Sequence, residues 1–243
     1  MKVTLLNYTP DGEKTIAAAA KLCYASADID TVMEGLTPEK TEKFLEMLAS
    51  LGHESPIEHI TFTFGIEGVS RALLAQITRH RIASFSVQSQ RYVKENIFTF
   101  VTPPAIAEDA EALQLYNQTM EDIFASYQNL ASTLEQKYLE TMDAKAAEKK
   151  AIEDARFVLP NACATKMIMT MNARSLLNFF RLRCCNRAQW EIRELAAQMC
   201  ALVKEVAPTI FRYAGPPCLK GRCPEGKMTC GKMQEMKQKY LGE

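Results

Sequence analysis

The sequence contains no run of about eighteen apolar residues, the length that a membrane-spanning helix requires. Its first residues also lack the basic region and the long apolar run of a secretory signal peptide. Excess charge is absent as well, because 29 basic residues balance 29 acidic ones. A general nucleic-acid binder usually carries a positive excess. These absences predict a cytoplasmic protein that binds neither a membrane nor nucleic acid over a broad basic surface.

The composition indicates an ordinary globular chain. Apolar residues make up 47% of it and charged residues 24%, which argues against disorder. A chain of 243 residues can bury a full hydrophobic core. The eight cysteines are not expected to form structural disulfides, because the cytoplasm keeps thiols reduced.

Carboxylates are missing from two long windows of the chain. The first window covers residues 68–94 and holds Arg71, Arg79, Arg81, Arg91 and Lys94. The second covers residues 155–190 and holds Arg156, Lys166, Arg174, Arg181, Arg183 and Arg187. Arginine stays charged and presents a planar fork of N–H donors, which suits phosphate groups. Because these arginines have no acidic neighbours in sequence, we expect discrete pockets for phosphate-bearing ligands.

We predict a single α+β domain, with a mixed or antiparallel sheet flanked by helices, over residues 1–213. Strands are expected near Val3 and Leu5, over residues 60–66 and over residues 165–171. Helices are expected over residues 12–24, 38–52, 69–80, 107–140, 143–156, 172–183 and 189–206. Residues 25–36 and the segment after Arg81 are predicted as loops, and residues 91–101 as extended chain. A cysteine-containing tail, peripheral and short of apolar residues, is predicted over residues 214–243.

Helical geometry makes two predictions about the basic residues. The helix after the second strand should deliver Gln76, Arg79 and His80 together. On the later helix, Arg174 and Asn178 share a face, whereas Arg183 follows nine residues after Arg174 and should leave the opposite side.

Five blocks of residues resemble the flavin-dependent thymidylate synthases, in the order of that family. The central block is Arg79-His80-Arg81, seven residues, Ser89 and then Gln90-Arg91-Tyr92. The others are His53-Glu54-Ser55-Pro56 with Glu58-His59, Ala155-Arg156 with Leu159-Pro160, Asn172-Ala173-Arg174-Ser175 with Asn178-Phe179, and Leu182-Arg183 with Ala188-Gln189-Trp190-Glu191. The resemblance covers about residues 1 to 213 and excludes the tail.

The resemblance implies a homotetrameric enzyme that methylates dUMP with methylenetetrahydrofolate, NADPH and bound FAD, and that shares its sites between subunits. By position, the residues implied to hold FAD are Ser55, Glu58, Arg79, His80, Arg81, Val87, Asn172, Arg174 and Asn178. Those implied to hold the nucleotide are Gln76, Arg79, Val87, Gln88, Ser89, Gln90, Arg91, Arg156 and Arg183. Val87 departs from the family, which often has a glutamate or glutamine there.

Three residues are candidates for the chemistry itself. Arg183 is assigned to the pyrimidine base, where a cation favours the anionic form at N3 and enriches C5 in electron density. His53 is expected to touch the flavin or the folate, although a lone histidine is commonly structural. Ser89 is expected to be a ligand of the nucleotide rather than a nucleophile, because nothing at its spacing supplies a general base.

Two alternatives remain open from the sequence. The tail cysteines Cys218, Cys223 and Cys230 invite a zinc interpretation, yet they lack a paired Cys-x-x-Cys and no histidine follows His80. A fourth ligand would have to come from Cys184, Cys185 or another subunit. We therefore predict no metal and a solvated tail of reduced thiols. The alternative function is an RNA-binding module that uses the two basic windows, with Phe85 and Tyr92 available for stacking.

Overall fold

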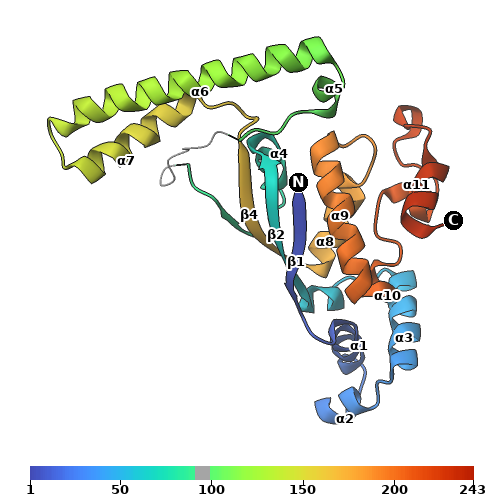
Figure 1. The fold of residues 1–243 in the computed structure, drawn as a ribbon. Helices are drawn as coiled ribbons and strands as arrows, with labels where there is room; N and C mark the ends of the chain where they lie inside the picture. The colour runs from blue at the N-terminus through green and yellow to red at the C-terminus, as the bar shows by residue number, and fades with distance from the viewer. Residues whose placement is uncertain (91–98) are drawn as a thin grey trace. The chain divides into compact units, whose positions relative to one another are not determined.

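The computed structural model describes residues 1–90 and 99–243 (Figure 1). Its four strands form one antiparallel sheet in the order β1-β2-β4-β3. The strands are β1 Lys2–Tyr8, β2 Thr61–Ser70, β3 Ser84–Val87 and β4 Ala164–Asn172. Together with the surrounding helices this confirms the α+β class. Within the described residues, no helix combines the length and apolarity needed to cross a membrane.

The described helices carry most of the chain. They are α1 Gly12–Leu22, α2 Ile29–Glu34, α3 Pro38–Leu51, α4 Arg71–Ile77, α5 Pro104–Ala107, α6 Ala110–Leu139, α7 Ala144–Ala155, α8 Ala173–Arg183, α9 Trp190–Val206, α10 Pro208–Phe211 and α11 Met233–Leu241. Short 3-10 turns are η1 Pro56–His59, η2 Arg156–Val158, η3 Pro217–Lys220 and η4 Gly226–Met228.

Two compact units make up the chain. The first contains Met1–Ile66, Ile77–Phe85 and Ile168–Glu243, and the second contains Glu67–Gln76 and Ser86–Met167. The boundary predicted between residues 213 and 214 therefore stays a prediction.

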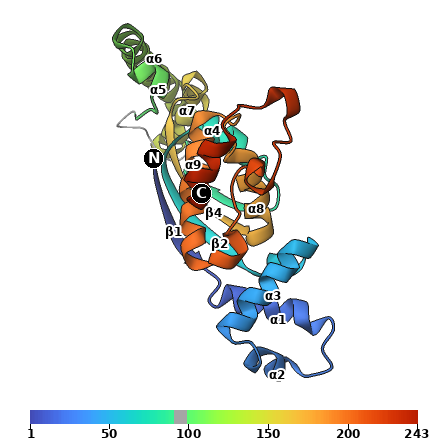
Figure 2. The same cartoon turned by 90° about the vertical axis from the view of Figure 1, so that its right-hand side faces the viewer.

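The core of the first unit lies between the sheet and helices α8 to α10. Along β2, Phe62 and Phe64 are buried, and they alternate with the more exposed Thr61 and Thr63, as period-two patterning predicts. Phe62 meets Phe211 of α10 edge-on, with ring centroids 5.4 Å apart. Figure 2 shows α8 and α9 running beside these strands. Burial on this face fixes α8, the helix from which several predicted ligands project.

Side-chain caps begin the predicted helices. Thr37 accepts a hydrogen bond from the backbone N–H of Lys40 (3.4 Å), and Asn172 accepts one from that of Ser175 (2.8 Å). Gly52 ends α3 with a φ of 73°, which glycine adopts without strain. Asp143 likewise caps α7. These starts and stops confirm the predicted helix boundaries to within a few residues.

In the second unit, α6 and α7 pack as an antiparallel pair (Figure 1). The hydroxyl of Tyr138 on α6 donates a 2.6 Å hydrogen bond to the carboxylate of Asp154 on α7. The predicted extended segment 91–101 is described only from residue 99. There Phe100 pairs with Cys163 in an isolated antiparallel bridge.

Three local predictions were wrong. Residues 25–36 contain the short helix α2, which Asp28 caps and which buries none of its residues. A helix with no buried residue leaves no apolar period in the sequence. The segment after Arg81 contains strand β3. The helix predicted over residues 69–80 is α4, which begins only after β2 has run to Ser70 and ends at Ile77, so Arg79 and His80 lie in the turn that follows it.

Candidate functional site

One cavity of about 810 Å³ lies within the first unit. Its walls come from η1, the turn after α4, helix α8 and the chain that follows α10. The lining residues are Glu54, Ile57, Glu58, Arg79, His80, Arg81, Ile82, Asn172, Arg174, Ser175, Leu177, Asn178, Arg181, Leu182, Arg183, Tyr213, Ala214, Gly215, Pro216, Pro217 and Lys220. Eight of the predicted ligands are among them, namely Glu58, Arg79, His80, Arg81, Asn172, Arg174, Asn178 and Arg183. The structure therefore gathers side chains from both acid-free windows around one space.

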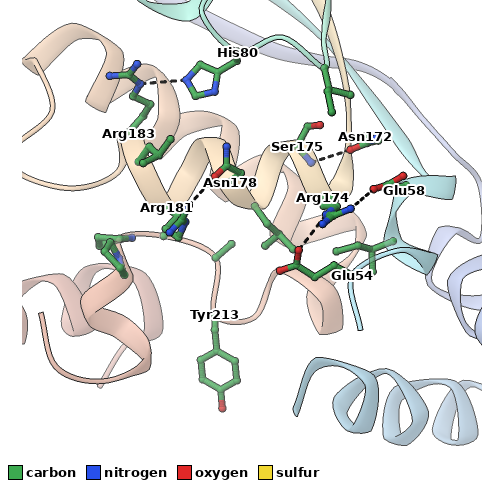
Figure 3. Close-up of a pocket in the computed structure, with 18 of the residues that line it drawn as sticks. Glu54, Glu58, His80, Asn172, Arg174, Ser175, Asn178, Arg181, Arg183 and Tyr213 are labelled. Atoms are coloured by element: carbon green, nitrogen blue, oxygen red, sulfur yellow. Dashed lines mark hydrogen bonds and ion pairs between the residues drawn. The ribbon is translucent and has the colours of Figure 1, made fainter. Parts of the chain in front are cut away.

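Helix α8 forms the long wall of the cavity (Figure 3). Arg174 and Arg183, which were predicted to leave opposite sides of this helix, both line this one cavity. Nine residues of helix span roughly 13 Å along the axis, so the two arginines lie near opposite ends of α8. A ligand that lies along α8 can meet both.

At one end of α8, Arg183 donates a hydrogen bond from Nε to Nε2 of His80 over 3.2 Å. The acceptor nitrogen must be unprotonated, which places the imidazole proton on Nδ1. Burial, and then the charge of Arg183, lower the pKa of His80. The His80 ring also packs edge-on against the buried Phe179, with centroids 4.9 Å apart. His80 is thus a neutral hydrogen-bond acceptor that orients the Arg183 guanidinium.

The same end of the cavity concentrates positive charge. Burial, and then the neighbouring charge of Arg79, lower the pKa of Arg183, and both arginines line the cavity. Within the described residues, no carboxylate forms an ion pair with Arg79, Arg81 or Arg183. Two adjacent arginines without an acidic partner repel each other unless an anion lies between them. The arrangement favours a phosphate or an anionic base.

At the other end of α8, Arg174 is held by two carboxylates. Its Nε donates to Glu54 over 3.1 Å and its Nη1 donates to Glu58 over 2.5 Å. The hydrogen bond to Glu58 is the largest cause of the raised pKa of Arg174. All three side chains are about half exposed, so solvent screens these ion pairs. An incoming anion has to compete with Glu54 and Glu58 for the guanidinium.

The two asparagines differ in how much hydrogen-bonding capacity they keep. The side-chain oxygen of Asn172 is occupied by the cap of α8. Asn178 accepts from Nη2 of Arg181 over 3.0 Å. Each amide nitrogen remains a possible donor toward the cavity.

The chain after α10 supplies a wall that the sequence did not reveal. Tyr213, Gly215, Pro216, Pro217 and Lys220 line the cavity, although this segment was predicted to be peripheral. Gly215 has a φ of 145°, and a Cβ there would lie 2.6 Å from Leu219 Cδ1. The Gly-Pro-Pro run was the available signal, since it marks a backbone held in a special conformation.

Other predicted ligands lie elsewhere in the described chain. His53 and Ser55 are exposed beside η1 and are not among the lining residues. In the second unit, Gln76 donates to the carbonyl of Ala72 (3.4 Å) and Arg156 to that of Glu153 (3.2 Å). Val87 ends β3, and Gln88, Ser89 and Gln90 follow it, all half-buried. Arg91 lies outside the described residues, and the roles of this whole group stay predictions.

The backbone around Gln88 is well fixed. Its N–H donates to the carbonyl of Lys166 over 3.0 Å, and its carbonyl accepts from Nη2 of Arg71 over 2.8 Å. The first of these bonds continues the pairing of β3 with β4 one residue beyond the strand. Both bonds use backbone groups of Gln88, so they do not involve its side chain.

Comparison with known proteins finds relatives that match nearly the whole chain. A family model described as "Thymidylate synthase complementing protein" matches residues 4–209. A flavin-dependent thymidylate synthase of Clostridium tetani is 58% identical over 242 residues, which cover 99% of this chain and 97% of that protein. Relatives of the same name from Geobacter sulfurreducens and Nitratidesulfovibrio vulgaris are 51% and 47% identical, covering 99% and 95% of this chain and 98% and 94% of their own lengths.

The first alignment also reaches into the tail, because 99% of the chain cannot be covered without it. The likeness therefore extends beyond the residues 1 to 213 on which the sequence resemblance rested. The family model matches more than half of the chain, and the relatives are 47% to 58% identical to it. These matches establish the family of the chain. The chain belongs to the flavin-dependent thymidylate synthase family.

Proposed function

We propose that the protein converts dUMP to dTMP by reductive methylation. Methylenetetrahydrofolate is the one-carbon donor, NADPH the reductant and FAD the bound cofactor. The observation that carries this proposal is the cavity along α8, where Arg79, Arg81 and Arg183 stand without carboxylate partners among the described residues. The names of the relatives support flavin and thymidylate chemistry.

The cavity fits FAD in size and in chemistry. Its volume of about 810 Å³ lies in the range of sites for ligands of this kind. A diphosphate needs several permanent cations, and Arg79, Arg81 and Lys220 all line the space. Apolar side chains such as Ile57 and Leu177 line it as well and suit the flat faces of a flavin. Arg174, Asn172 and Asn178 would complete the cofactor contacts along the helix.

FAD, when bound, supplies the redox chemistry and the acceptor for the one-carbon unit. The protein's own residues bind and polarise the substrates. Arg183 would stabilise negative charge at N3 of the pyrimidine and so make C5 more nucleophilic. His80 keeps Arg183 in place through the 3.2 Å hydrogen bond. Because the site is partly desolvated, the charge of Arg183 stabilises a nearby anion more strongly than it would in water.

The nucleotide loop supplies the rest of the substrate contacts in this proposal. Gln88, Ser89, Gln90 and Arg91 would hold the phosphate and the base, with Gln76 and Arg156 beside them. Ser89 acts as a ligand, since a nucleophile would require an adjacent base. A homotetramer with sites shared between subunits is the assembly that the sequence resemblance implies, and we propose that it acts in the cytoplasm.

The absorbance spectrum of the purified protein tests the proposal. We expect an oxidised-flavin band, or its appearance after FAD is added, and bleaching when NADPH is supplied without oxygen. An Arg79→Ala, Arg81→Ala double variant should lose most of the bound flavin. A protein that remains colourless with excess FAD would refute the proposal. The RNA-binding alternative has no support from the relatives described above, and a titration with labelled RNA would expose it.

A further inference from the structure

Helix α10 leads into the part of the cavity lining formed by residues 213–217, which we call the tail-side wall. The helix has no capping side chain of its own, because the residue before it is Ala207. Pro208 at its first position has no backbone N–H. The first backbone donors of α10 are therefore those of Thr209 and Ile210, and such donors have no partner within a helix.

Glu13, near the start of α1, supplies the missing cap from the other end of the chain. Its Oε1 accepts hydrogen bonds from the backbone N–H of Thr209 over 2.7 Å and from that of Ile210 over 3.0 Å. Its Oε2 accepts a third bond, from the hydroxyl of Thr209 over 3.0 Å. Hydrogen bonds to a carboxylate are stronger than those between neutral groups. One side chain of α1 therefore satisfies both first donors of α10.

Other contacts hold the far end of α10. Phe211 is buried, and its ring meets those of Phe62 and Phe180, with centroids 5.4 Å and 6.0 Å apart. The helix lies against α9 and α3 (Figure 1). Arg212, directly after α10, pairs with Glu46 of α3 over 2.9 Å, but both side chains are about half exposed and solvent screens the pair. Glu13 thus holds the first turn of α10, and Phe211 holds its end.

The tail-side wall begins two residues after the end of α10, at Tyr213. The N–H of Ala214 donates to the carbonyl of Phe211 over 2.9 Å, so the backbone turns directly from the helix into the wall. The carbonyl of Ala214 accepts a 3.4 Å hydrogen bond from Sγ of Cys200 on α9. Because the helix and the wall are continuous, a displacement of α10 is passed on to the lining of the cavity.

Beyond the tail-side wall, the tail forms a small apolar core. Cys218, Leu219 and Met236 are buried together, and Tyr240 packs against them. The prediction of a solvated tail was therefore wrong for Cys218, which is only 7% exposed. This core holds the far end of the tail-side wall. The path of the wall is consequently set from both ends, by the core and by α10.

We propose that Glu13 is a positioning residue for the cofactor cavity, which sets the path of the tail-side wall by capping α10 and so raises the affinity for FAD. This inference rests on the proposed function, in which FAD occupies the cavity. Glu13 itself does not line that cavity. Without the cap, the wall would follow its binding-competent path only part of the time, and the apparent affinity would fall by that fraction.

Titration of the full-length protein with FAD tests the inference. Glu13→Ala should raise the Kd for FAD about 2- to 30-fold, which is the range that the loss of a helix cap implies. The kcat at saturating FAD should stay near that of the wild type, because Glu13 contacts no reacting group. Glu13→Gln should restore the affinity, since its Oε1 can accept both N–H bonds and its Nε2 can donate to the hydroxyl of Thr209.

Asp28→Ala is the matched control. Asp28 caps α2 in the same unit, by accepting a 2.8 Å hydrogen bond from the backbone N–H of Thr31, and α2 contributes no lining residue to the cavity. A general loss of stability would affect both cap variants alike. The inference predicts weaker FAD binding in Glu13→Ala alone, at a temperature well below the melting temperature of each variant.

A measurement without flavin separates this inference from the proposed function. Amide hydrogen exchange in the unliganded full-length protein should be faster at residues 209–215 in Glu13→Ala, and unchanged there in Asp28→Ala. A wild-type protein that binds no FAD would refute the proposed function, whereas unchanged exchange in Glu13→Ala would refute the role of the cap.

Three results of the titration would overturn the inference even when the wild type binds FAD. These are wild-type affinity in Glu13→Ala, an equal loss of affinity in Asp28→Ala, and no recovery in Glu13→Gln. If Glu13→Ala does not fold, Thr209→Val removes only the bond to Oε2 and should weaken FAD binding in the same direction by a smaller factor. Unchanged affinity in that variant would then overturn the inference.

Discussion

Arg183 and His80 form a cation–acceptor pair in which the imidazole must stay neutral, because its Nε2 receives the guanidinium N–H over 3.2 Å. The pair joins the turn after α4 to the last turn of α8. A proton on Nε2 would remove the acceptor and place two positive charges in contact. The position of Arg183 in the cavity is therefore linked to pH through His80.

The first prediction follows from this linkage. The pKa of His80 is lowered below its usual 6.5, so the unfolded chain binds this proton more strongly than the folded chain. The contribution of His80 to stability is fully present above about pH 6.5 and is lost as the pH falls below that value. Melting temperature measured against pH should show this loss. His80→Gln should flatten that part of the curve, whereas His59→Gln, at an exposed site, should leave it unchanged.

The second prediction concerns Arg183 and catalysis. Arg183→Ala should lower kcat for dTMP formation by about 10²–10³-fold, because the developing charge on the pyrimidine loses its cation. Arg183→Lys keeps the charge without the planar fork and should recover part of the rate. Arg193→Ala is a matched control, since Arg193 is also half-buried and makes one hydrogen bond, to the carbonyl of Asn186. Equal losses at both positions would contradict a catalytic role for Arg183.

The third prediction concerns competition at Arg174. Glu54→Gln should tighten FAD binding, because it removes a carboxylate that accepts a 3.1 Å hydrogen bond from the Arg174 guanidinium and competes with the cofactor for it. Exposed ion pairs are worth about 0.2–1 kcal/mol, so we expect a gain of no more than a few-fold in affinity. Arg174→Ala should weaken binding. Glu46→Gln, which breaks a similar exposed pair with Arg212, is the control. Flavin fluorescence titration measures all four proteins, and weaker binding by Glu54→Gln would show that Glu54 contacts the cofactor.

The fourth prediction uses two glycines with similar φ angles. Gly215 has a φ of 145° and Gly221 a φ of 154°, but only at Gly215 would a Cβ meet other atoms. Gly215→Ala should therefore cost about 1–3 kcal/mol more in the free energy of unfolding than Gly221→Ala. Urea denaturation of both variants measures the difference. Equal costs would mean that Leu219 and Tyr240 relax without penalty.

The fifth prediction tests the shared sites of the proposed tetramer. Arg91→Ala and Arg183→Ala variants should each be almost inactive, because each loses a contact to the nucleotide. If one site takes the two arginines from different chains, co-expression creates some sites with both intact. Activity should then be partly restored in mixed oligomers verified by pull-down with two tags. Mixed oligomers as inactive as either parent would place both arginines in one chain.

Long elements with a buried face were predictable from the sequence. The alternation at Phe62 and Phe64 identified β2, and the helices predicted to start near Pro38 and Asn172 are α3 and α8. Short elements were missed, because α2 buries nothing and β3 has only four residues. Periodicity requires several turns or repeats to rise above chance.

The candidate site was predictable in its chemistry more than in its geometry. Unpaired arginines indicated an anion site, and Arg79, Arg81 and Arg183 do line one cavity. The angle between Arg174 and Arg183 around the helix axis suggested two separate sites. The sequence does not show how far a cavity extends along a helix, so it did not reveal that both residues line one cavity. The place of Lys220 in the cavity could not be predicted for a similar reason, since tertiary packing brings this part of the tail to the cavity.

Gly215 also constrains how this protein can change by mutation over time. Its missing side chain leaves room for Leu219 and for the ring of Tyr240, which lies in the last helix of the chain. A larger residue at position 215 would have to displace both side chains and would also adopt the strained φ of 145°. A shortened C-terminus would remove Tyr240 but would leave Leu219 and this φ in place. We expect positions 215, 219 and 240 to vary together or not at all. Substitutions in α11 would then be coupled to substitutions at Gly215, which lines the cavity.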